Sequence, residues 1–79
     1  MPPNTFNQAR TILAGNVKSA RLAAGISQEE LAFRAGIDRT YASQIERAIA
    51  NPSLGITCAI ADALGCALID LLTTRGGED

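Results

Sequence analysis

The side chains best suited to recognition chemistry lie in one short run of the sequence, residues 38–47. This run contains Arg39, Thr40, Ser43 and Gln44. An arginine can donate two hydrogen bonds to guanine O6 and N7, and a glutamine can pair with adenine N6 and N7, whereas hydroxyls have no fixed base preference. On one helix these side chains would read base edges in the major groove. The competing interpretation makes Arg39 a solvated side chain or a phosphate clamp, and Gln44 a neutral surface residue.

Catalytic and metal chemistry find no support in the same sequence. There is no histidine for a catalytic triad, no phosphate-binding glycine-rich loop and no pair of carboxylates at a useful spacing. Cys58 and Cys66 cannot form a four-ligand zinc site by themselves, and a cytoplasmic protein is not expected to join them in a disulfide. We therefore expect both cysteines to pack as small apolar residues, and we expect no enzymatic activity, cofactor, metal or small-molecule ligand.

Residues 27–46 have the signals of a helix-turn-helix, which would position these polar side chains. Ser27 followed by Glu30 is a capping box, and Asp38 can cap a second helix. Gly36 can end the first helix because glycine reaches positive φ without a Cβ clash. The apolar residues expected to face inward are Leu31, Ala32, Ala35, Ile37, Ala42 and Ile45. The second helix of such a unit enters the major groove of DNA; the alternative is an ordinary helical hairpin.

A long helix is predicted before this unit. Thr5 with Gln8 would form its capping box, and Gly25 would end it. Gly15 either weakens this helix by about 1 kcal/mol or allows something to pack closely. The residues expected to face inward are Ala9, Leu13, Val17, Ala20 and Ala24.

Two helices are predicted after the unit. Ser53 would cap the first and Gly65 would end it, with an inward face of Leu54, Cys58 or Ile60, Ala61 and Leu64. The last short helix is apolar nearly all round, and it contains Leu68, Ile69, Leu71 and Leu72. A helix this apolar needs a second surface to cover it. The same helix of a second subunit would do so about a twofold axis; alternatively, the helix folds back on its own core.

Length and charge are compatible with one small domain of 79 residues, all-α with five helices. Residues 1–4 would form a loose arm and residues 73–79 a polar tail. The net charge is −1, but residues 1–50 carry six basic against four acidic side chains, and residues 51–79 carry one against four. The basic half thus coincides with the helix-turn-helix, and a polarised surface is expected. Without a signal peptide or a long apolar run, the sequence predicts a cytoplasmic protein that does not enter a membrane.

Several strings of the sequence resemble the phage repressor/Cro-type family of helix-turn-helix regulators. They are R-L-A-A-G-I-S-Q-E-E-L-A (21–32), S-Q-I-E-R (43–47), N-P-S-L (51–54) and I-A-D-A-L-G (60–65). The resemblance covers about residues 10–72 and implies a dimeric, sequence-specific transcriptional regulator. The string D-R-T-Y-x-S-x-I-E-R followed by Asn51 is similar to the controller proteins of restriction–modification systems, although generic members carry it as well.

The resemblance also implies roles for individual residues. Positions that face base edges are Arg39, Thr40, Ser43 and Gln44; positions that touch the sugar–phosphate backbone are Gln28, Tyr41, Arg47 and Asn51. Arg21 and Glu46 match a largely buried ion pair between the first helix and the end of the recognition helix. Ala48 stands where many members have glycine, and Ala42 where a larger branched residue is common. Lys18 is a further candidate for a phosphate contact, or is simply solvated.

The sequence therefore predicts a homodimer that binds double-stranded DNA at a roughly palindromic site, with Leu68, Ile69, Leu71 and Leu72 at the dimer interface. Activation, as opposed to repression, would require a surface for RNA polymerase. Two rival hypotheses remain. One is an antitoxin- or antagonist-type module whose apolar last helix binds a different protein. The other keeps the fold but has lost DNA binding, and the low net charge favours it.

Overall fold

The structure, a computed structural model, describes residues 4–74, and these form five α-helices. They are α1 (Thr5–Ala24), α2 (Gln28–Ala35), α3 (Arg39–Glu46), α4 (Leu54–Leu64) and α5 (Leu68–Leu72). The predicted all-α fold with five helices is confirmed. Most of the predicted N-terminal arm and C-terminal tail, residues 1–3 and 75–79, lies outside the described residues. No helix in the described part of the chain is long and apolar enough to cross a membrane.

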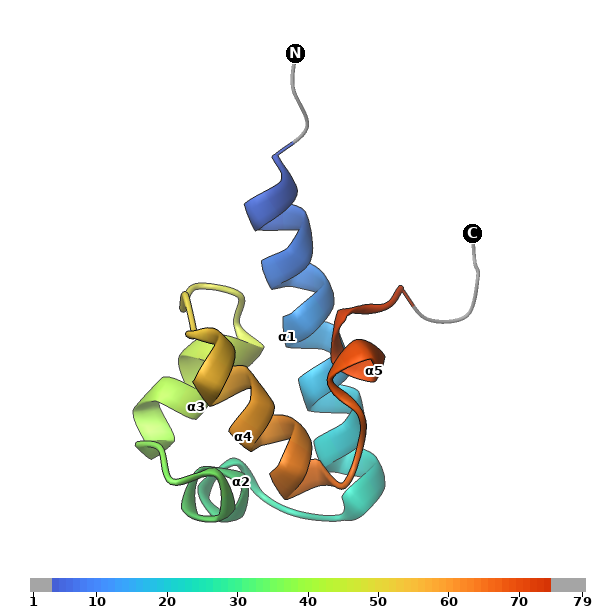
Figure 1. The fold of residues 1–79 in the computed structure, drawn as a ribbon. Coiled ribbons are helices and arrows are strands. Elements are labelled where there is room, and N and C mark those ends of the chain that lie inside the picture. Colours follow the sequence, from blue (N-terminus) through green and yellow to red (C-terminus); the bar gives the residue numbers. More distant parts are fainter. Residues whose placement is uncertain (1–3, 75–79) are drawn as a thin grey trace.

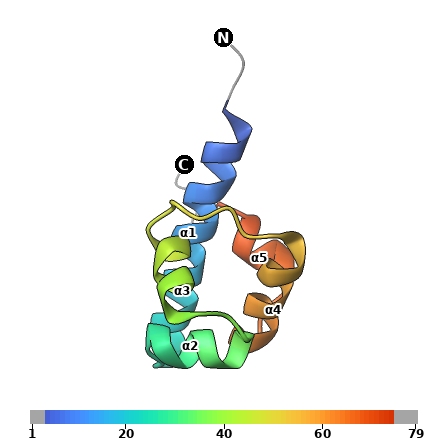
Figure 2. The same ribbon diagram turned by 90° about the vertical axis from the view of Figure 1, so that its left-hand side faces the viewer.

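The long helix α1 packs against α3, α4 and α5, whereas α2 packs against α3 and α4 (Figure 1). At one end α2 and α3 form the helix-turn-helix, and α4 packs against α2 while α3 packs against α1. Towards the middle of α1, α5 packs against its other side. The view in Figure 2 places α3 and α5 on opposite sides of this assembly. The first turns of α1 project beyond the rest of the domain, so one end of this helix has few neighbours (Figures 1 and 2).

Local capping signals account for most helix ends. Ser27, Asp38 and Ser53 each accept a backbone N–H at the start of a helix, from Glu30 at 3.0 Å, Thr40 at 2.8 Å and Ile56 at 3.1 Å. The helices α1, α2 and α4 end at glycines with φ of 72°, 73° and 69°. Such a left-handed backbone costs a residue with a Cβ about 1–2 kcal/mol. These ends were all predicted from sequence.

The start of α1 was predicted wrongly. Asn4, and not Thr5, is the capping residue, since its Oδ1 accepts the N–H of Asn7 at 3.1 Å. Thr5 is instead the first residue of the helix. Asparagine is at least as good a cap as threonine, so the one-residue shift follows from a better acceptor placed just upstream.

The core lies where all five helices meet, and its largest fully buried side chains are Val17, Leu31, Ile45, Ile60 and Leu71. The inward face predicted for α1 is correct at Leu13 and Val17 but wrong at Ala9 and Ala24, which are exposed. The first turns of α1 project past their neighbours, which explains Ala9. Leu54, predicted to face inward, is 69% exposed in the first turn of α4.

A buried asparagine holds α5 in place. Asn16 is 5% exposed in the middle of α1, and its Nδ2 donates to the carbonyl oxygens of Leu71 and Thr73, both at 2.9 Å. These carbonyls lie at the C-terminal end of α5, where no helical N–H can pair with them. Asn16 therefore supplies the cap that this five-residue helix lacks in its own sequence.

Neither cysteine is in a disulfide, and both are half-buried. Burial raises the pKa of the Cys66 thiol, and the nearby carboxylate of Asp70 raises it further. A raised pKa leaves less thiolate, the reactive form, near neutral pH. This supports the predicted packing role for Cys66.

Candidate nucleic-acid interface

A buried ion pair fixes the recognition helix α3 against α1. The Arg21 guanidinium donates to both carboxylate oxygens of Glu46, from Nε at 2.6 Å and from Nη2 at 3.1 Å. The two side chains are only 11% and 3% exposed. The hydrogen bonds that Arg21 donates to Glu46 raise the pKa of Arg21 above its ordinary value, although burial opposes this shift. The predicted pair is confirmed, and its bidentate geometry is the one that fixes orientation best.

Two further hydrogen bonds extend this pair into a network. Arg21 Nη1 donates to the carbonyl oxygen of Ile26 at 2.9 Å, and Gln28 Nε2 donates to Glu46 Oε1 at 3.1 Å. The network thus connects the end of α1, the turn before α2, the first residue of α2 and the last residue of α3. Gln28, expected at the DNA backbone, is held in this network by its hydrogen bond to Glu46.

The four residues predicted to face base edges lie on one side of α3. Arg39 and Thr40 are exposed in its first turn, and Ser43 and Gln44 are half-buried one turn later. Residues four apart lie above one another on a helix, so these side chains form one continuous strip. The opposite side of α3 is buried through Ala42 and Ile45, which are 1% and 2% exposed.

The residues predicted to touch the DNA backbone surround this strip. Arg47 is exposed at the C-cap of α3, and Asn51 is exposed in the loop that follows, whereas Tyr41 is half-buried and packs against the core. Two salt bridges occur among the described residues, Arg21–Glu46 and Arg34–Glu30. Arg39 and Arg47 take part in neither, so both cations are available to an anion.

The exit from α3 has a strained backbone. Ala48 has φ of +60° and is the one non-glycine residue with positive φ among residues 4–74. This is the position where the resembled family often has glycine, and glycine adopts that conformation without a Cβ clash. The strained residue turns the chain sharply into the loop that carries Asn51 before Pro52.

The apolar surface around α5 differs from the predicted one. Ile69 and Leu72 are 66% and 41% exposed, and Leu68 is half-buried. Leu71 is 1% exposed and belongs to the core, so the prediction that it lies at an outer interface was wrong. A five-residue helix that is apolar on every side gives no periodicity from which its inner residue could be identified.

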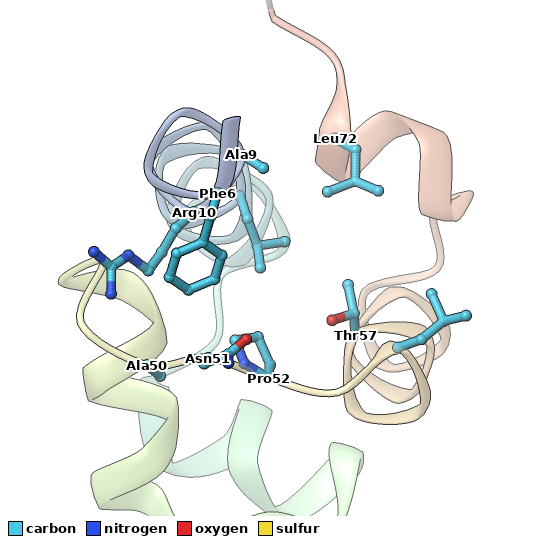
Figure 3. Close-up of a pocket in the computed structure, with 10 residues that line it drawn as sticks. Phe6, Ala9, Arg10, Ala50, Asn51, Pro52, Thr57 and Leu72 are labelled. Carbon is cyan, nitrogen blue, oxygen red and sulfur yellow. The ribbon is translucent and has the colours of Figure 1, made fainter. Parts of the chain in front are cut away.

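Two exposed residues continue this apolar surface: Phe6, which the sequence analysis did not identify, and Leu54, which it expected to face inward. Phe6 of α1 is 49% exposed, and it lines a groove together with Leu54 and Leu72 (Figure 3). The groove has a volume of about 270 Å³. A phenylalanine among the polar residues of the first turn is the sequence signal that could have identified this site.

Comparison with known proteins also indicates a helix-turn-helix protein. Residues 17–71 match the protein family described as Helix-turn-helix. The control protein C.SmaI of Serratia marcescens is 39% identical over 71 residues, which are 90% of this chain and 84% of that protein.

Two crystal structures are similar over most of the chain. The hypothetical transcription factor NHTF from Neisseria has a TM-score of 0.82 and 43% identity, covering 85% of this chain and 77% of that one. The restriction–modification controller protein C.AhdI from Aeromonas hydrophila has a TM-score of 0.76 and 35% identity, covering 78% of this chain and 94% of that one.

Proposed function

Because this chain belongs to the helix-turn-helix family of DNA-binding transcriptional regulators, we propose that it acts as a homodimer on a palindromic operator. We further propose that it controls a restriction–modification operon together with its own gene, as the similarity to control proteins suggests. Each subunit would place α3 in one major groove, with half-sites about one helical turn apart. The family is a non-enzymatic class, in agreement with the sequence analysis.

The observation that carries this proposal is the network around Glu46. It holds α3 by three hydrogen bonds to one carboxylate, while Arg39 and Thr40 of the strip are exposed to solvent. Positioning a helix this firmly reduces the entropy lost when its side chains meet base edges. We assign base contacts to Arg39, Thr40, Ser43 and Gln44, with Arg39 as the principal reader of guanine.

Backbone contacts are assigned to Gln28, Tyr41, Arg47 and Asn51. Gln28 lies at the N-terminus of α2, where unpaired N–H groups favour a phosphate. The side chain of Gln28 contacts Glu46, the last residue of α3, so Gln28, Arg47 and Asn51 would all contact phosphates beside the C-terminal end of α3. Such contacts set the register of the protein but carry no sequence information.

The homodimer would form through Leu68, Ile69 and Leu72. Leu54 lines a groove together with Leu72 and is 69% exposed, so this side of the domain presents further apolar surface. A stable interface buries about 800 Å² on each partner, of which about 60% is apolar. A second copy of the same face would cover these exposed apolar side chains about a twofold axis.

An antitoxin- or antagonist-type module remains the alternative, because the same exposed face of α5 would suit a different protein. A monodisperse homodimer in solution would argue against it. A stable monomer that exposes Ile69 and Leu72 would favour it.

The test is fluorescence anisotropy on duplex DNA from upstream of the gene that encodes this protein, against a scrambled duplex. Wild type should bind the upstream duplex far more tightly, and Arg39→Ala should lose about 1–3 kcal/mol of that margin while keeping its weaker, sequence-independent binding. Equal binding of wild type to both duplexes would contradict autoregulation at this site. An unchanged margin in Arg39→Ala would contradict the role of Arg39.

A further inference from the structure

Arg10 is a cation that the proposed interface does not use. It lies in the projecting part of α1, and it lines the same groove as Ala50, Asn51 and Pro52 of the α3–α4 loop (Figure 3). Arg10 thus comes, from a distant part of the sequence, to the loop that leaves the C-terminal end of the recognition helix.

The Arg10 side chain is held in a defined position by uncharged partners. Its guanidinium carbon lies 4.7 Å from the centre of the Phe6 ring, and its Nη2 donates to Asn7 Oδ1 at 2.5 Å. The stacking is a cation–π interaction. Neither salt bridge within residues 4–74 includes Arg10, in contrast to Arg21 and Arg34, which each bind a glutamate.

This arrangement leaves the positive charge of Arg10 without an acidic partner in the described part of the chain and most of its N–H donors unused. A guanidinium has five N–H donors, of which the contact with Asn7 uses one. The residues that line the groove include no Asp or Glu, so no acidic group there competes for the cation. The side chain is already partly ordered, which lowers the entropic cost of binding an anion.

The position of the groove suggests which anion this is. The groove shares Asn51 with the proposed backbone contacts, and Arg47 begins the same loop at the C-cap of α3. When α3 lies in a major groove, a phosphate strand runs past this end of the helix. The projecting turns of α1 extend the protein surface beyond this loop (Figures 1 and 2).

We propose that Arg10, positioned by Phe6 and Asn7, is an additional phosphate contact that lengthens the DNA-binding surface beyond the helix-turn-helix. The inference rests on the proposed mode of DNA binding. It assigns to α1 a role in affinity and none in reading sequence, because a phosphate contact is the same at every base pair.

The test measures the salt dependence of binding for wild type and Arg10→Gln on the upstream and scrambled duplexes. Each phosphate neutralised contributes about 0.9 to the slope of log affinity against log salt concentration. Loss of Arg10 from both subunits should therefore lower the slope by about 2 and weaken binding on the order of tenfold on both duplexes. Arg10→Lys, which keeps the charge, should retain most of the slope.

Arg34→Gln is the matched control, because it removes the same charge from an arginine that is paired with Glu30 on α2. It should leave the slope close to that of wild type. Sedimentation of Arg10→Gln without DNA should show an unchanged dimer.

An unchanged slope in Arg10→Gln, or an equal loss in Arg34→Gln, would overturn the proposal, and so would a loss of dimerisation in Arg10→Gln. These outcomes are separate from a failure of the proposed function. That failure would appear in wild type as equal affinity for the two duplexes, whereas the slope can be compared on either one.

Discussion

The two sides of this small domain differ in which side chains they expose to solvent. At the α2–α3 end, charged groups pair inside the protein, apolar side chains of α3 are buried, and the outward strip of α3 is polar. On the side formed by α5 and the first turns of α1 and α4, Phe6, Leu54, Ile69 and Leu72 stay exposed. The outward strip of α3 is suited to a polar ligand such as DNA, although Phe33 of α2 is also exposed at this end. The α5 side leaves apolar area uncovered and is suited to another protein surface.

The most severe way to break the α2–α3 side is to remove Glu46. Glu46→Ala would leave Arg21 without its partner at a site 11% exposed, and we expect a loss of about 3–5 kcal/mol in the free energy of unfolding. Urea denaturation followed by circular dichroism measures this. Glu30→Ala removes an exposed partner of Arg34 and should cost less than about 0.5 kcal/mol. Similar losses of unfolding free energy in the two variants would contradict the conclusion that the buried Arg21–Glu46 pair stabilises the fold more than the exposed Arg34–Glu30 pair.

On the other side, Ile69→Lys should separate the dimer without unfolding the subunit. Placing a charge in the apolar centre of the interface should raise the dimer dissociation constant about 100-fold. Analytical ultracentrifugation measures this constant. Phe33→Lys is the control, since Phe33 is 82% exposed on α2, away from the proposed interface. If Phe33→Lys separates the dimer instead, the partner surface has been placed on the wrong side.

Asn16 connects α1 to α5, and its removal should have a smaller effect. Asn16→Leu would leave the carbonyl oxygens of Leu71 and Thr73 without their donor. We expect a loss of about 2 kcal/mol in stability and weaker dimerisation, because α5 would be less well held. Hydrogen exchange at α5 amides should rise. Ser19→Leu on the exposed side of α1 is the control, and equal exchange at α5 in both variants would speak against the capping role.

The smallest expected effect is a gain in stability from Gly15→Ala. Nothing lies within 4 Å of a Cβ built at Gly15, so no close packing requires glycine there. Of the two explanations open from sequence, the weakened helix therefore remains. Alanine should add about 1 kcal/mol to the free energy of unfolding, as the reverse change Ala23→Gly should subtract a similar amount. Thermal unfolding checks both, and a destabilised Gly15→Ala would indicate a neighbour that this structure does not place at that position.

Features that depend on neighbouring residues were the ones predictable from sequence. The caps of α2, α3 and α4 and the glycines that end α1, α2 and α4 were all correct, because each involves residues within about four positions. The Arg21–Glu46 pair spans 25 positions, and only the family resemblance identified it.

Features that depend on distant residues were missed. The acceptors of Asn16 lie 55 and 57 residues away, so nothing local marks this asparagine as structural. Leu54 was expected to be buried and is exposed, whereas Leu71 was expected at an outer interface and is buried. For Leu71, the way α5 packs against the core decides which of its leucines is buried, and the five residues of α5 do not contain that information.

The continuity of α1 has a consequence for the operator. This helix of 20 residues, about 30 Å long, carries both Asn16, which holds α5, and Arg21, which holds α3. If two subunits join through α5, the continuous α1 of each subunit connects that interface to α3 and so sets the distance and angle between the two copies of α3. One base pair inserted between the half-sites shifts one of them by about 3.4 Å and rotates it by about 34°. Because one continuous helix, Thr5–Ala24, carries the contacts to both α5 and α3, we expect the spacing between half-sites to tolerate little variation.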